Sequence, residues 1–123
     1  MLLNRGTDFL DPLRPGFPTT ISNFVGSGTG DEGANNRYIS PAAQTPEMDK
    51  VSFANFPRTF ISCGGYETLR DQIVVLKERM ERDLGDKLAF YEMPEAFHDT
   101  LIFRWFEPER STCLQKIAEW IDL

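Results

Sequence analysis

The stretch that decides the fold is TFISCGG, residues 59–65. A short β-branched and aromatic run that is closed by two glycines is typical of a buried strand. After this run in the sequence, apolar residues recur every three or four positions from Leu69 to Leu84, which predicts an amphipathic helix over residues 68–84. A second strand is predicted over residues 87–92, because Pro94 cannot continue a ladder.

Two strands joined by a helix of this length are expected to be parallel, since a hairpin cannot accommodate the crossover. A closing amphipathic helix is predicted over residues 108–122, with its apolar face formed by Leu114, Ile117, Ala118 and Ile121. The fold class is therefore α/β, with a βαβα unit. A parallel sheet needs more strands and two covered faces, so we expect this unit to be part of a larger sheet.

The chain divides into a loop-rich segment, residues 1–56, and an α/β core, residues 57–123. Proline and glycine turns crowd the first segment, where residues 28–33 formally match the dinucleotide pattern G-x-G-x-x-G. No helix pattern opens after that match, and Asp31 and Glu32 would repel a pyrophosphate. We interpret it as a surface loop, so a nucleotide-binding half-domain is the weakest functional hypothesis.

Composition excludes several classes of protein. The 123 residues carry 13 basic and 19 acidic side chains, a net charge of −6 that disfavours nucleic acid as a partner. The longest apolar runs are a few residues, so no membrane span is expected, and no apolar stretch of a secretory signal follows residues 1–3. This leaves the compartment open. One histidine and two cysteines, Cys63 and Cys113, predict packed thiols, no metal cluster and no cofactor.

The candidate chemistry lies after the two predicted strands. Glu67 follows the first strand, and His98, the only histidine, follows the second. The carboxyl ends of parallel neighbours share one edge, so these side chains can form an acid–histidine pair. Asp71 is the alternative acid, although residues 68–71 fit a capping box that would occupy it. Asp99 is expected to point away from His98 into solvent.

Three segments then carry a resemblance to a known family: NRYISP at 36–41, FPRTFISCGGYETLRDQ at 56–72 and AFHD at 96–99. Together they resemble the C-terminal part of α/β-hydrolases of the hormone-sensitive-lipase-like carboxylesterase group, over roughly residues 35–123. The resemblance implies a partial α/β-hydrolase fold and hydrolysis of small carboxylic esters by a Ser/acid/His triad. Glu67 matches the acid, where the family usually has Asp in a run like Asp-Pro-Leu-Arg-Asp, and His98 matches the histidine.

The family's nucleophile elbow, G-x-S-x-G, and its His-Gly-Gly oxyanion segment have no counterpart in this sequence. We therefore expect a C-terminal fragment, by truncation or gene-model error, that does not hydrolyse esters alone. In such esterases the last helix sometimes mediates dimers, so a homodimer through residues 108–122 is a further expectation. The alternative hypothesis is a noncatalytic remnant that acts as a binding or interaction module through its exposed sheet edge.

Overall fold

A computed structural model describes residues 23–24 and 36–122 of the chain. Its regular elements are β1 (Thr59–Gly64), α3 (Arg70–Leu84), β2 (Leu88–Met93) and α4 (Glu109–Ile121). Three single 3-10 turns accompany them: η1 (Met48–Lys50), η2 (Gly85–Lys87) and η3 (Thr100–Ile102). The chain is thus a small α/β unit in βαβα order, as predicted. The glycine-rich residues 28–33 lie outside the described residues.

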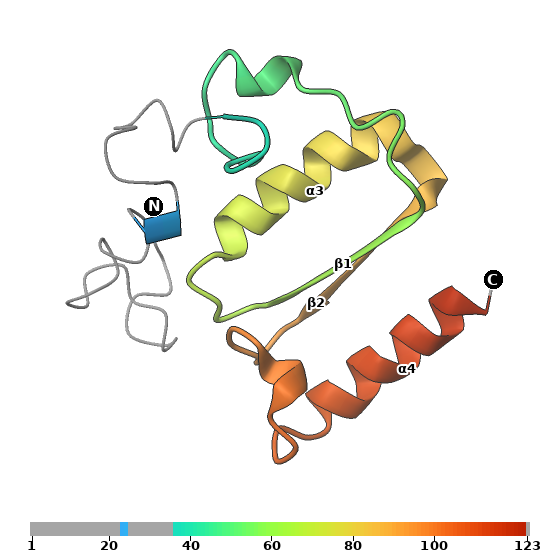
Figure 1. Cartoon of the computed structure of the whole chain (residues 1–123). Coiled ribbons are helices and arrows are strands. Elements are labelled where there is room, and N and C mark those ends of the chain that lie inside the picture. Colours follow the sequence, from blue (N-terminus) through green and yellow to red (C-terminus); the bar gives the residue numbers. More distant parts are fainter. Residues whose placement is uncertain (1–22, 25–35, 123) are drawn as a thin grey trace.

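The two strands are parallel, and their register pairs Thr59 with Leu88 and Gly64 with Met93. Both strands therefore end at the same edge. Figure 1 shows α3 on one side of the strand pair and α4 on the other. Within the described residues the sheet has only these two strands.

Each face of the strand pair has its own core cluster, because alternate side chains of a strand point to opposite faces. On the α3 face the buried residues are Phe53, Met80 and Leu84, and the half-buried Ile61 and Leu88 pack against them. On the α4 face the buried residues are Met93, Ala96 and Cys113, with Tyr91, Leu101, Phe106 and Ile117 around them.

The face of α4 that packs on the sheet differs from the prediction. The helix buries Cys113 and half-buries Ile117, and Trp120 contacts Phe60 of β1 edge to face at 5.8 Å between ring centroids. Leu114, Ala118 and Ile121, three of the four residues of the predicted core face, are exposed. The apolar residues of this helix cover a wide arc, so periodicity alone did not separate the buried side from the neighbouring one. The homodimer stays a prediction.

Four boundaries of the central elements also differ from the prediction, each by one or two residues, and one of them is the end of β2 at Met93 instead of Glu92. The N-cap of α3 is Leu69, and no side chain caps the helix, so the predicted capping box of residues 68–71 is wrong. The backbone forms a turn there instead, in which Arg70 N–H donates to Glu67 O at 3.2 Å. Strand β1 runs one residue further, through Gly64. At the other end of α3, Gly85 has a φ of +55° and opens a 3-10 turn, so β2 begins at Leu88.

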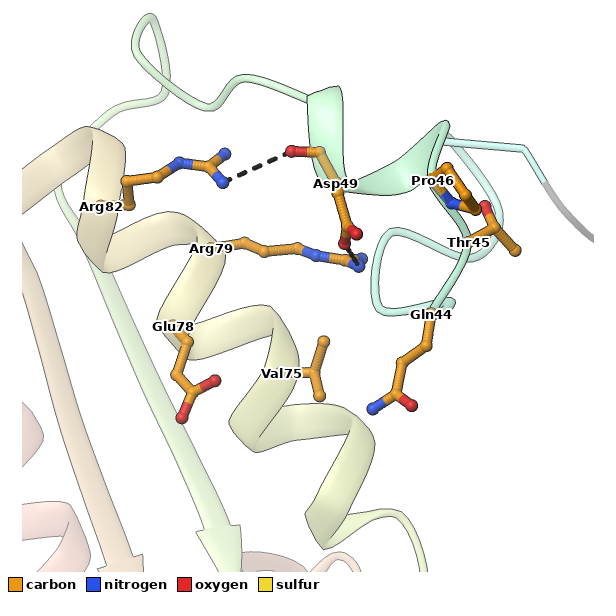
Figure 2. Close-up of a pocket in the computed structure, with 8 residues that line it drawn as sticks. All are labelled: Gln44, Thr45, Pro46, Asp49, Val75, Glu78, Arg79 and Arg82. Atoms are coloured by element: carbon orange, nitrogen blue, oxygen red, sulfur yellow. Dashed lines mark hydrogen bonds and ion pairs between the residues drawn. The ribbon is translucent and has the colours of Figure 1, made fainter.

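The described part of the loop-rich segment is held against α3 by polar contacts. Arg79, only 7% exposed, donates to Pro41 O at 2.6 Å and to Asp49 Oδ1 at 2.6 Å. Arg82 donates to Val51 O at 3.0 Å, and Figure 2 shows both guanidinium groups extending from α3 toward Asp49. Two arginines of one helix thus position residues 41–51, which contain no regular element longer than η1.

Among the residues that the structure describes, none of the helices has the length and apolar character that crossing a bilayer requires.

Candidate functional site

Two glycines bring the loops after β1 and β2 into backbone contact. A Cβ on Gly64 would lie 2.3 Å from Ala96 O, and one on Gly65 would lie 2.2 Å from Pro94 O. Gly65 N–H donates to Met93 O at 2.8 Å, and Tyr66 N–H donates to Ala96 O at 2.9 Å. Side chains at positions 64 and 65 would separate the loops, so the double glycine does more than end a strand.

Glu67 and His98, which lie 31 positions apart in the sequence, meet at this edge. His98 Nδ1 lies 2.6 Å from Glu67 Oε1, and Gly64 N–H donates to Glu67 Oε2 at 3.0 Å. The glutamate side chain is 6% exposed and the imidazole is 24% exposed. A carboxylate only accepts hydrogen bonds, so this contact places a proton on Nδ1. The acid is buried and oriented, while the imidazole reaches the surface.

Asp99 lies on the other side of the imidazole, which corrects the expectation that it points away. Its Oδ2 is 3.5 Å from His98 Nε2, and its side chain is 56% exposed. The physical reason is the backbone: Asp99 has a φ of +56°, the left-handed conformation that aspartate tolerates better than most residues. This conformation turns the chain sharply after His98, so the two neighbouring side chains approach each other.

The histidine loop is closed by Thr100, a residue that the sequence did not single out. Its hydroxyl donates to Phe97 O at 2.7 Å and accepts from Phe97 N–H at 3.1 Å, and the residue is 1% exposed. Serine and threonine hydroxyls commonly bond to backbone groups three residues away in turns. The three-residue spacing between Phe97 and Thr100 could have indicated this turn, but the burial of Thr100 is visible only in the structure.

Asp71, the alternative acid, belongs to the first turn of α3. Its Oδ1 lies 3.7 Å from Arg70 Nη1, and about half of the side chain is exposed. Arg70 also reaches across to β2, where its Nη2 lies 2.8 Å from Glu92 Oε2. This second ion pair connects the first residue of α3 to Glu92, near the end of β2. Sequence reasoning missed it because nothing local relates positions 70 and 92.

A hollow of about 280 Å³ opens beside the Glu67–His98 pair. The side chains around it include Cys63, Met93, Thr100 and Ile102. The pKa of the Cys63 thiol is raised to about 11 because the group is buried and lies near the carboxylates of Glu92 and Glu67. A thiol with this pKa stays protonated at neutral pH and is a poor nucleophile. No cluster of metal ligands occurs among residues 23–24 and 36–122.

Comparisons with protein families, with curated proteins and with solved structures find no match to this chain. The candidate site is therefore defined by the contacts of Glu67 with His98 and with Gly64 N–H.

Proposed function

We propose that Glu67 and His98 are the acid and the base of a Ser/acid/His triad that hydrolyses small carboxylic esters. The observation that carries the proposal is the 2.6 Å contact between Nδ1 and a carboxylate oxygen that is itself buried and held by a backbone N–H. In such triads the acid binds Nδ1 and the nucleophile approaches Nε2, on the outer side of the ring. The partial α/β-hydrolase fold belongs to the same proposal, because the βαβα order agrees with the resemblance of the sequence.

The reaction assigns each atom of the pair one task. His98 Nε2 takes the proton of a serine hydroxyl while the serine oxygen bonds to the ester carbonyl carbon. The imidazolium then gives that proton to the leaving alkoxide as the carbon–oxygen bond of the ester breaks. A water molecule repeats both steps on the acyl-enzyme and releases the acid. Glu67 stays ionised throughout, holds the ring in one tautomer and stabilises the transient positive charge.

The serine comes from outside this chain in the proposal. The sequence contains no G-x-S-x-G, and the hydroxyl of Ser62, the serine next to the hollow, bonds to Cys113 of α4. In the proposal, the backbone N–H groups that bind the oxyanion also come from outside this chain, and such donors usually supply a large share of the rate enhancement. The chain by itself therefore lacks ester turnover.

The acid–base pair is tested on the purified chain by nitrogen-15 NMR of its only imidazole. The expected result is a ring that carries a proton on Nδ1, and loss of that preference in Glu67→Leu but not in the exposed control Glu95→Leu. A neutral ring whose single proton is on Nε2 in the unmodified chain would refute the pairing.

The hydrolytic role is tested by sequencing the transcript upstream of the first codon and assaying any extended protein on ethyl butyrate. The proposal expects an in-frame G-x-S-x-G and an activity that His98→Ala abolishes. An extended protein that contains the serine but keeps its activity in His98→Ala would contradict the assigned role of the histidine.

The second candidate is a noncatalytic binding module, and one observation favours it. Ile102 and Trp105, next to the histidine loop, are 69% and 77% exposed. The Trp105 ring packs against Phe103, with 5.1 Å between the ring centroids. Exposed apolar residues that gather in this way are typical of contact surfaces. An upstream sequence without any serine elbow, combined with partner binding that Trp105→Ser abolishes, would favour the module over the hydrolase.

A further inference from the structure

The carboxylate of Asp99 lies at the nitrogen of His98 that the proposed mechanism uses. Asp99 Oδ2 is 3.5 Å from Nε2, whereas Glu67 Oε1 is 2.6 Å from Nδ1, so each ring nitrogen faces a carboxylate. A serine must approach Nε2 to give up its proton. Asp99 and that serine therefore compete for the same place.

The two carboxylates are held very differently. The Glu67 side chain is 6% exposed and accepts from Gly64 N–H at 3.0 Å, so it is fixed in place. The Asp99 side chain is 56% exposed, and within the described part of the chain its carboxylate has no polar contact other than the one with His98. Asp99 can thus leave Nε2 by rotating its own side chain, without breaking another ion pair or hydrogen bond.

The backbone keeps Asp99 beside the ring although its side chain is mobile enough to leave. Ile102 N–H donates to Asp99 O at 2.9 Å, and the φ of +56° at Asp99 turns the chain sharply after the histidine. On the other side of His98, the buried hydroxyl of Thr100 accepts from Phe97 N–H and donates to Phe97 O. The residues before and after the histidine are therefore fixed by one compact turn.

The contact with Asp99 has a direct consequence for the protons of the ring. A carboxylate only accepts hydrogen bonds, so Oδ2 attracts an Nε2 that carries a proton and repels an Nε2 that presents a lone pair. Glu67 already places a proton on Nδ1. A ring with a proton on both nitrogens has no lone pair with which to take a proton from serine. Cys63, the remaining titratable side chain of the adjacent hollow, stays protonated and adds no charge.

We propose that Asp99 is an autoinhibitory residue: its carboxylate holds a proton on Nε2 of His98, and the ring becomes a base only when a serine displaces that carboxylate. This inference rests on the proposed function, because Nε2 has to be freed only if a serine uses it. On displacement, the carboxylate turns into water, the proton of Nε2 passes to solvent, and Nδ1 keeps its proton on Glu67. The acid–base pair is thus closed until the part that carries the serine is in place.

The test measures how fast diethyl pyrocarbonate acylates His98, the only histidine of the sequence, in the purified chain at one neutral pH. The reagent reacts with a ring nitrogen that has a lone pair, and Nδ1 is covered by Glu67, so the rate reports a free Nε2. Asp99→Asn keeps the shape of the side chain and its tolerance of the left-handed φ but removes the charge. It is expected to react about two- to fivefold faster, as loss of a half-exposed ion pair implies. Glu95→Gln, which removes an exposed carboxylate of the same loop, is the matched control and is expected to react at the unmodified rate.

Salt and NMR supply two independent readouts. Sodium chloride at about 1 M screens exposed ion pairs, so it is expected to speed the reaction of the unmodified chain but not that of Asp99→Asn. In nitrogen-15 NMR, Asp99→Asn is expected to keep the proton on Nδ1, while the Nε2 signal of His98 moves toward that of a nitrogen with a lone pair. A merely structural role of Asp99 would not produce this change at one nitrogen alone.

Two rate outcomes would overturn the role of Asp99: a rate in Asp99→Asn that is unchanged or slower, and an equal acceleration in Glu95→Gln. If the amide spectrum of Asp99→Asn is not native, the unmodified chain decides, and a rate that salt leaves unchanged overturns the role. A proton kept on Nδ1 together with an unaccelerated Asp99→Asn refutes the role of Asp99 alone. A neutral ring whose single proton is on Nε2 refutes the proposed function and, with it, this inference.

Discussion

Replacing Gly64 by alanine is expected to pull the candidate acid and base apart. The new Cβ would lie 2.3 Å from Ala96 O, 2.6 Å from Ala96 C and 2.9 Å from Phe97 N, whereas ordinary contacts begin at 3.4 Å. All three atoms belong to the backbone, so no side chain can rotate out of the way. The loop after β2 must move by about 1 Å, given the 2.3 and 3.4 Å values.

A movement of this size is large compared with the contact that it disturbs. The Nδ1–Oε1 distance between His98 and Glu67 is 2.6 Å, and another 1 Å along that line takes it beyond the range of a hydrogen bond. Overpacking in a dense site costs about 1–3 kcal/mol, and the weakened hydrogen bond to a charged group adds about 1 kcal/mol. We therefore expect Gly64→Ala to lower the free energy of unfolding by about 2–4 kcal/mol.

The assay combines urea unfolding with nitrogen-15 NMR of the His98 ring, and Gly85→Ala is the matched control. Gly85 has a φ of +55°, but a Cβ there would meet nothing within 4 Å. Its replacement costs about 1–3 kcal/mol of backbone strain far from the pair. Both variants are expected to be less stable, while only Gly64→Ala loses the ring protonated at Nδ1. A Gly64→Ala protein with native stability and an unchanged ring signal would refute the reasoning.

Three further predictions follow from other parts of the structure. Arg79→Met is expected to lower the free energy of unfolding by about 1–3 kcal/mol and to speed proteolysis of residues 41–51. Arg82→Met, which replaces a half-exposed side chain, is expected to have a smaller effect, and equal effects of the two variants in urea unfolding and proteolysis would contradict this. For Cys63, the raised pKa means that the unfolded chain loses its thiol proton around pH 9.0, whereas the folded chain keeps it until about pH 11. The contribution of this thiol to the free energy of unfolding is therefore fully present below pH 9 and falls by about 1.4 kcal/mol per pH unit between these two values. This slope should be smaller in Cys63→Ala when unfolding is measured across pH 8–11, and an unchanged slope would contradict the assignment. Asp99→Gly is expected to be more stable than Asp99→Ala by about 1 kcal/mol in thermal unfolding, because the left-handed φ strains alanine, and the opposite order would rule out that conformation.

The sequence by itself was enough for the order of the elements and for the two side chains of the candidate pair. The strand before Gly64 and the amphipathic helix that ends at Leu84 are local patterns, and local patterns specify local structure. The helix between the strands made them parallel, and parallel strands end at one edge. Glu67 and His98 could therefore be placed near each other without any knowledge of the contacts between them.

The tertiary structure alone decided how those residues are held. The predicted capping box was wrong because the N-cap of α3 is Leu69, whose side chain has no acceptor, while Glu67, two residues earlier, contacts His98, which lies 31 positions away in the sequence. The approach of Asp99 to the imidazole depends on a backbone angle, and the role of Gly64 depends on a carbonyl of the opposite loop. These contacts join positions that are distant in the sequence. No periodicity or motif within one segment contains them, because they arise only when the two strand ends are packed together.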